Sequence, residues 1–138
     1  MREMKKITGL LMAMLLLLSA CGSVPLTGRK QVLLVSDQEV LTSSLTQYSD
    51  YMKSATKSTD KNESAMVTRV GKKIAAATEA YLKANGMESE IKNFQWEFNL
   101  VKDNQINAFC MPGGKIVVYE GLMSLVSSDD ELAVVVGH

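Results

Sequence analysis

Few side chains in this sequence could carry out chemistry, because its 138 residues include one histidine and two cysteines. The histidine is His138, the last residue, which follows a run of apolar residues. An imidazole can bind a metal ion or transfer a proton, although a single histidine on an apolar helix is more often structural. Cys110 lies between Phe109 and Met111, which predicts a buried, unreactive thiol. With the only histidine at the end of the chain, a Cys-His nucleophile is disfavoured.

The residues before His138 have the pattern of a capped helix. Ser128 and Glu131 are three apart, the spacing of a capping box, and acidic residues are favoured in a first helical turn. We therefore expect a helix that begins at Ser128 and runs through the apolar residues 132–136. No stop signal follows it, and a natural terminus in a valine-rich helix would be unusual. We expect the chain to be a C-terminally truncated fragment; a true terminus at His138 is the alternative.

This helix resembles the first half of a zincin active-site helix. In such helices two histidines four positions apart bind zinc, and the glutamate after the first histidine is the general base. The pattern E-L-A-x-V-x-G-H is matched by Glu131, Leu132, Ala133, Val135, Gly137 and His138.

Two further stretches, VPLTGRKQ at 24–31 and NAFCMPGGKIVVYEGL at 107–122, extend the resemblance. Together with the helix they resemble the HtpX-like and CAAX-prenyl-protease-like zinc metallopeptidases of the gluzincin type, most closely the lipoprotein members of the bacterial envelope. The resemblance implies zinc (Zn²⁺) as cofactor, held by His138, by a second histidine one turn later and by a glutamate from a following helix. The general base would be a glutamate directly after His138. No catalytic residue is therefore expected within this chain, which should be inactive as given.

The resemblance also implies a substrate-binding strand. In the family the strand that corresponds to Asn107, Ala108 and Phe109 runs beside the cleft, so these residues would bind an extended peptide as an added strand. The structural alternative is that Phe109 belongs to the core and that residues 112–114 form a simple hairpin turn.

Hydrophobic periodicity predicts the elements that must position these residues. Apolar side chains at helical spacing predict a helix at 37–54, and a polar loop at 54–64 follows it. A second helix is expected at about 64–84, with its buried stripe formed by Val67, Val70, Ile74, Ala77 and Tyr81. Alternation predicts a half-buried strand at 94–101, with one side formed by Phe94, Trp96, Phe98 and Leu100 and the polar side by Gln95, Glu97 and Asn99. Two more strands are expected at 106–111 and at 115–119, the latter β-branched at its centre. The turn Pro112-Gly113-Gly114 joins the last two, and Gly121 should break the third strand before a short helix at 122–126.

These elements predict the fold class α+β. We expect N-terminal helices, a small, mainly antiparallel sheet with a PGG turn, and then the start of the zincin active-site helix. Three regions follow: a lipoprotein signal peptide at 1–20, a lipid-anchored tether at 21–35, and the incomplete N-terminal portion of a zinc metallopeptidase domain at 36–138.

The first twenty-one residues have the layout of an export signal. Arg2, Lys5 and Lys6 precede the apolar run Gly9–Leu18, and small residues lead to Cys21. The apolar run of about ten residues is half the length that a membrane-spanning helix needs. The leucine, two small residues and cysteine resemble a lipobox, which implies cleavage before Cys21 and its acylation. A spanning helix and an ordinary secreted protein are the alternatives.

Charge and composition limit the partners. Residues 1–20 hold three basic and one acidic side chain of the 15 of each sign, which leaves 12 basic and 14 acidic in the mature chain. No basic patch stands out, so nucleic acid is not an expected partner.

Two functions fit these observations. The first is a zinc endopeptidase of the bacterial cell envelope, lipid-anchored and facing the periplasm, which cleaves protein or peptide substrates in quality control. The second is a non-catalytic lipoprotein that uses the same fold as a binding or chaperone module. The sequence predicts neither the substrate, nor the oligomeric state, nor whether the inner or outer membrane holds the anchor.

Overall fold

The computed structural model describes residues 1–18, 21–23, 30–32 and 36–138. These residues fall into two compact units, 1–37 and 38–138. The elements are, in chain order, α1 (Arg2–Leu18), β1 (Cys21–Ser23), β2 (Lys30–Val32), α2 (Asp37–Ser54), α3 (Lys61–Ala84), the 3₁₀ helix η1 (Glu88–Asn93), β3 (Glu97–Val101), β4 (Ala108–Met111), β5 (Lys115–Tyr119), α4 (Glu120–Met123) and α5 (Asp129–Gly137).

The first unit holds α1 and a two-stranded antiparallel ladder of β1 with β2. The apolar run of the predicted signal lies in α1, and Cys21 is the first residue of β1. In the described part of the chain, no helix has both the length and the apolar character needed to cross a membrane. Ser19 and Ala20 of the predicted cleavage site, residues 24–29 of the VPLTGRKQ stretch, and residues 33–35 of the predicted tether lie outside the described residues.

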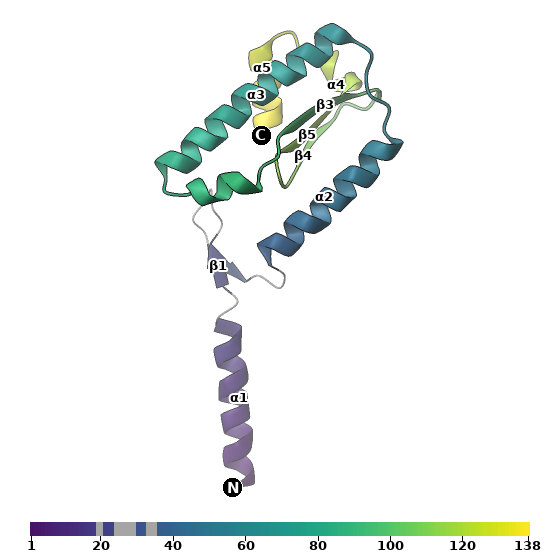
Figure 1. The fold of residues 1–138 in the computed structure, drawn as a ribbon. Coiled ribbons are helices and arrows are strands. Elements are labelled where there is room, and N and C mark those ends of the chain that lie inside the picture. Colours follow the sequence, from purple (N-terminus) through teal and green to yellow (C-terminus); the bar gives the residue numbers. More distant parts are fainter. Residues whose placement is uncertain (19–20, 24–29, 33–35) are drawn as a thin grey trace. The chain divides into compact units, whose positions relative to one another are not determined.

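The second unit is built on a three-stranded sheet of order β3-β5-β4, which confirms the α+β class (Figure 1). β4 and β5 form an antiparallel hairpin, whereas β3 and β5 run parallel. The sheet is therefore mixed rather than mainly antiparallel. The reason is that β5 inserts between β3 and β4, so the hairpin's second strand pairs with both.

The predicted PGG turn closes the hairpin. Gly113 and Gly114 have φ angles of +91° and +80°, in the left-handed region that favours glycine. A Cβ atom on Gly114 would also meet the Trp96 ring. The turn therefore needs glycine for both its backbone conformation and its close packing, and β5 begins at Lys115 as predicted.

One face of the sheet packs against α3 and α5 through an apolar core (Figure 1). Its completely or almost completely buried residues come from all these elements: Val67, Val70, Leu100, Ile116, Val118, Leu122, Met123 and Leu132. The predicted alternation of β3 placed Trp96, Phe98 and Leu100 on one side, and all three pack in this core.

The opposite face is covered by α2, through a smaller cluster of Tyr48, Val101 and Val117. Asn99, expected on the polar side of β3, is buried there, and its amide donates to the Tyr48 hydroxyl over 2.7 Å. The expectation of a strand buried on one side only is therefore wrong. Both faces of the sheet are covered, and Asn99 is accommodated because it has a hydrogen-bond partner.

Helix α3 begins three residues before the predicted start. Asp60 caps it, because the Asp60 carboxylate accepts a hydrogen bond from the Glu63 backbone N–H over 2.9 Å. The buried stripe also differs: Ala77 and Tyr81 are exposed, while Ala75 and Leu82 are buried. The buried residues follow spacings of three and four along the whole helix. The prediction was wrong after Ile74, because both Ala75 and Ala77 fit an apolar pattern and it chose Ala77.

Strand β5 ends at Tyr119 as predicted, but Gly121 lies inside α4, which spans Glu120–Met123 rather than 122–126. A Cβ atom at this position would overlap the backbone carbonyls of Asn104 and Gln105. The glycine is therefore explained by the close approach of the β3–β4 connection, which the sequence alone did not indicate.

Candidate substrate strand and metal-ligand helix

Helix α5 begins where the capping pattern predicted. The Ser128 hydroxyl accepts a hydrogen bond from the Glu131 N–H over 3.2 Å. In return the Glu131 carboxylate accepts the N–H and the hydroxyl of Ser127, over 2.8 and 2.9 Å. These bonds hold the pKa of Glu131 below its usual range. The carboxylate is therefore part of the cap. In an ordinary capping box it would accept the N–H of the cap residue Ser128, whereas here it accepts that of Ser127, one residue earlier.

Two contacts fix the body of α5. Leu132 is completely buried between α3 and the sheet. Asp129 forms a bidentate ion pair with Arg69 of α3, with Nε–Oδ2 and Nη2–Oδ1 distances of 3.0 and 2.9 Å. The hydrogen bonds from Arg69 lower the pKa of the Asp129 carboxyl, and Lys73 contributes by its charge.

His138 is the C-terminal cap residue of α5 and is exposed. A catalytic zinc ion takes three protein ligands. Within the described residues no group of three histidine, cysteine, aspartate or glutamate side chains could hold a metal ion. The residues present therefore supply one candidate ligand, His138, and do not form a zinc site by themselves.

Strand β4 holds two of the three predicted substrate residues and lies at the edge of the sheet. Asn107 directly precedes it: the Asn107 carbonyl accepts the Tyr119 N–H over 3.1 Å, which continues the ladder to β5. In an antiparallel ladder, alternate residues direct their backbone groups away from the partner strand. With Ala108 opposite Val118, the outward-facing groups are those of Ala108 and Cys110.

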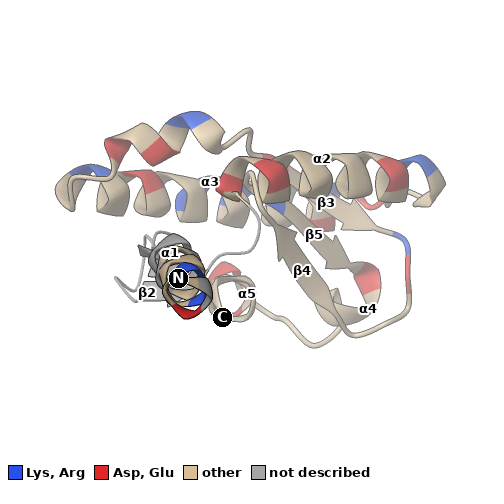
Figure 2. Ribbon diagram, turned by 90° about the horizontal axis from the view of Figure 1, so that it is seen from below, with Lys and Arg blue, Asp and Glu red and all other residues tan. Residues whose placement is uncertain are grey.

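The outer edge of β4 is partly occupied by a side chain. Asn107 Oδ1 accepts the Ala108 N–H over 2.9 Å. Among the described strands, none pairs with this edge. Since β4 has no charged residue (Figure 2), an extended peptide could add there through backbone hydrogen bonds from Cys110 onwards.

Phe109 points to the α2 side of the sheet and is half-buried. Its ring contacts Tyr51 and Tyr119 edge-to-face, at centroid distances of 5.3 and 6.0 Å. The two tyrosine hydroxyls are 3.3 Å apart. Phe109 is thus a packing residue that holds the edge strand, as the structural alternative expected, and its side chain faces away from α5.

Cys110 is exposed, so the prediction of a buried thiol is wrong. Its side chain points to the α5 side, as that of Ile116 opposite it does, and it is exposed because no further described strand lies beyond edge strand β4. The sulfur lies 4.0 Å from the Val136 carbonyl, and the desolvation by these neighbours raises the pKa of the thiol. The thiolate is disfavoured, although the residue is accessible.

The Cys110–Val136 contact also defines the arrangement of the site. α5 lies alongside β4 (Figure 2), and His138 comes two residues after Val136. The structure therefore places the predicted substrate strand next to the end of the predicted metal-ligand helix.

A buried polar network on the α2 side was missed by the sequence reasoning. Lys115 is almost fully buried; its ammonium donates to the Gln95 carbonyl and pairs with the Glu97 carboxylate at 2.8 Å. It also lies 5.6 Å from the centre of the Tyr48 ring. Strand periodicity could have indicated the burial of Lys115. Residues two positions apart in a strand share a face, so Lys115 lies on the same face as the buried Val117.

Edge strand β4 and helix α5, which ends at the exposed His138, both lie in the part of the chain that matches a known metallopeptidase profile. Residues 62–138 match the sequence profile of peptidase family M48, and the chain belongs to this family.

The relatives are metalloendopeptidases. The chain is 45% identical over 56 residues to mitochondrial metalloendopeptidase OMA1 of Arabidopsis thaliana, and this match covers 41% of this chain and 12% of that protein. It is 38% identical over 50 residues to OMA1 of Schizosaccharomyces pombe, a match that covers 36% of this chain and 15% of that protein. The chain is 26% identical over 117 residues to mitochondrial metalloendopeptidase OMA1 of Homo sapiens, a match that covers 83% of this chain and 21% of that protein. The chain thus spans between 12% and 21% of the length of these relatives.

Proposed function

We propose that this chain supplies the substrate strand and the first zinc-ligand helix of a zinc metalloendopeptidase. The observation that carries the proposal is the placement of edge strand β4 alongside α5, which ends at His138, in a chain of peptidase family M48. Zinc is the proposed cofactor, and His138 is the ligand that this chain contributes.

In this proposal the chain's own residues bind and orient the peptide. The outward backbone groups of β4 pair with the substrate backbone, so binding is largely independent of substrate sequence. Asn107 already occupies the Ala108 N–H, so the pairing starts at Cys110 or requires the amide to move. Phe109 keeps the strand in place through Tyr51 and Tyr119 on the other face.

We further propose that the protein is an HtpX-like lipoprotein of the bacterial envelope, acylated at Cys21 and facing the periplasm, where it takes part in protein quality control. The basic residues and the apolar run before Cys21 support this assignment. Cys21→Ala should abolish incorporation of a palmitate analogue and release the protein from membranes. Unchanged incorporation would contradict the anchor.

The catalytic proposal has a direct first test in the gene. The reading frame after His138 should encode Glu-x-x-His, which supplies the general base and the second ligand. Any other sequence at this place, including a stop codon, would contradict the enzyme.

The second test is casein cleavage by the protein that includes this motif, with and without a chelator. Cleavage should stop when the metal is removed and return when zinc is added. Activity that survives complete metal removal would exclude zinc as the cofactor, and casein binding without any cleavage would support the non-catalytic binding or chaperone module instead.

A further inference from the structure

We propose that Arg69 is a positioning residue, whose bidentate pair with Asp129 fixes the direction of α5 and thereby the place of the His138 imidazole. The sequence patterns gave Arg69 no role. The catalytic consequence of the pair rests on the proposed function, whereas the fixing of α5 can be tested independently.

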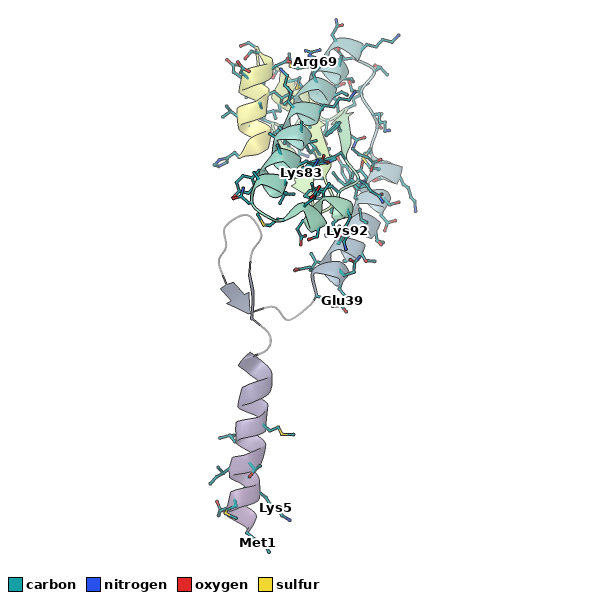
Figure 3. All side chains as sticks on the ribbon, turned by 60° about the vertical axis from the view of Figure 1, so that its left-hand side comes forward. Met1, Lys5, Glu39, Arg69, Lys83 and Lys92 are labelled. Atoms are coloured by element: carbon teal, nitrogen blue, oxygen red, sulfur yellow. The ribbon has the colours of Figure 1, made fainter. Side chains whose placement is uncertain are left out.

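The geometry of the pair is specific. The two hydrogen bonds of 3.0 and 2.9 Å join Nε and Nη2 of Arg69 to the two carboxylate oxygens of Asp129. Such a parallel pair of bonds sets the orientation of the carboxylate as well as its distance, which a lysine cannot do. Figure 3 shows Arg69 on α3 beside the start of α5.

Apart from this pair, its N-terminal cap and the Cys110–Val136 contact, α5 is held by apolar side chains: Ala133 and Val136 pack, partly buried, against the same core as Leu132. It spans only Asp129–Gly137, and Leu132 is its single completely buried side chain. Val134 and Val135 are 73% and 44% exposed. Apolar contacts hold α5 against the core but do not direct it as hydrogen bonds do, so the Arg69–Asp129 pair adds a directed contact at the start of the helix.

The lever from this contact to His138 is long. Asp129 and His138 are nine positions apart, which corresponds to about 13 Å along a helix. A tilt of about 5° would move the end of α5 by about 1 Å. A misplacement of this size in a catalytic site can reduce the rate by up to about 100-fold.

The other charges around Asp129 attract its carboxylate but do not fix its orientation. Asp129 lies in the first turn, where the helix dipole favours a negative charge, and the Lys73 charge acts on it as well. These effects persist when Arg69 is replaced. Arg69→Met therefore removes the charge of Arg69 together with its two directed hydrogen bonds, and Arg69→Lys, which keeps the charge, separates the two contributions.

The test compares Arg69→Met, Asp129→Asn and the double variant in the protein that carries the zinc motif. Arg69→Met should speed amide hydrogen exchange at residues 133–137 by about 10-fold and lower kcat by about 10-fold, with KM within about 2-fold of the wild type. The visible spectrum of the cobalt-substituted protein should shift. The double variant should lose no more than either single variant, because both remove the same pair, and Arg69→Lys should lose less than Arg69→Met.

Lys53→Met is the matched control, since Lys53 forms an exposed ion pair with Asp50 on α2 at 3.4 Å. It should leave exchange in α5, kcat and the cobalt spectrum unchanged. The inference is overturned if Arg69→Met remains folded with unchanged exchange and kcat, or if the two single losses multiply in the double variant. Absence of zinc and cleavage in the wild type would instead contradict the proposed function, while the exchange measurement would still decide whether the pair fixes α5.

Discussion

The two faces of the sheet are covered in different ways. On one face α3 and α5 enclose a core of aliphatic side chains, in which Val118 and Leu132 are completely buried. On the other face α2 packs through tyrosines, and Asn99 and Lys115 are buried beneath it. Each of these polar groups has a partner, and among the described residues no buried side-chain polar atom lacks one.

The difference separates two tasks. The aliphatic face carries α5, and shape complementarity there sets the position of the helix that ends in His138. The α2 face holds the edge strand through the packing of Phe109 on Tyr51. The Asn99–Tyr48 hydrogen bond joins the sheet to α2, and the Lys115–Glu97 ion pair joins β5 to β3. Substitutions on the aliphatic face should therefore reduce the free energy of unfolding most. On the polar face, the loss should depend on which partner of an interaction is removed.

The largest effect is expected for Leu132→Ala, which leaves a cavity in the aliphatic core. The free energy of unfolding should fall by about 2–5 kcal/mol, measured by urea denaturation. The control is Val134→Ala on the exposed side of the same helix, with an expected change within about 0.5 kcal/mol. Equal losses in the two variants would show that α5 is not packed on this core.

A smaller effect is expected on the polar face, and the two partners of the ion pair should differ. Glu97→Ala leaves the buried Lys115 ammonium without its carboxylate and should cost about 1–3 kcal/mol, near the lower limit because the Glu97 side chain is 53% exposed and screened by water. Lys115→Met leaves a carboxylate that water can solvate and should cost less. The reverse order in urea denaturation would contradict the account of this face.

The smallest effect is expected away from both faces, at Glu63 near the start of α3. Burial, together with the charges of Asp60 and Glu120, raises the pKa of Glu63 above its ordinary value of 4.5. The folded state therefore favours the protonated form, and stability falls as the pH rises through 4.5 to the folded pKa. Glu63→Gln should remove this fall and stabilise the protein at pH 7 by less than about 0.5 kcal/mol, with no gain at pH 3.5 in urea denaturation.

The sequence predicted the fold best where local patterns decide it. The capped start of α5, the helix at 37–54 and the PGG hairpin depend on neighbouring residues, and the structure has each of them. The parallel pairing of β3 with β5, the burial of Asn99 and the close approach at Gly121 depend on residues distant in sequence. Such contacts leave no periodic signal, so these features could not be predicted.

The residues of the candidate site stay predictions, whereas the residues that support them were missed. The resemblance implied His138 and Asn107, Ala108 and Phe109, and the structure places β4 alongside α5. Arg69, Tyr51 and Lys115 were missed, because each acts through a partner from another element. Cys110 was wrongly expected to be buried, since a single sequence does not show that its strand lies at an edge.

The most direct test of the central claim is the comparison of wild type and His138→Ala in the protein that carries the proposed Glu-x-x-His motif. Zinc content and casein cleavage should be measured on the same samples, with circular dichroism to check folding. The account predicts about one zinc per wild-type molecule with cleavage, and loss of both in a folded His138→Ala variant. Full zinc content and undiminished cleavage in that variant would contradict it.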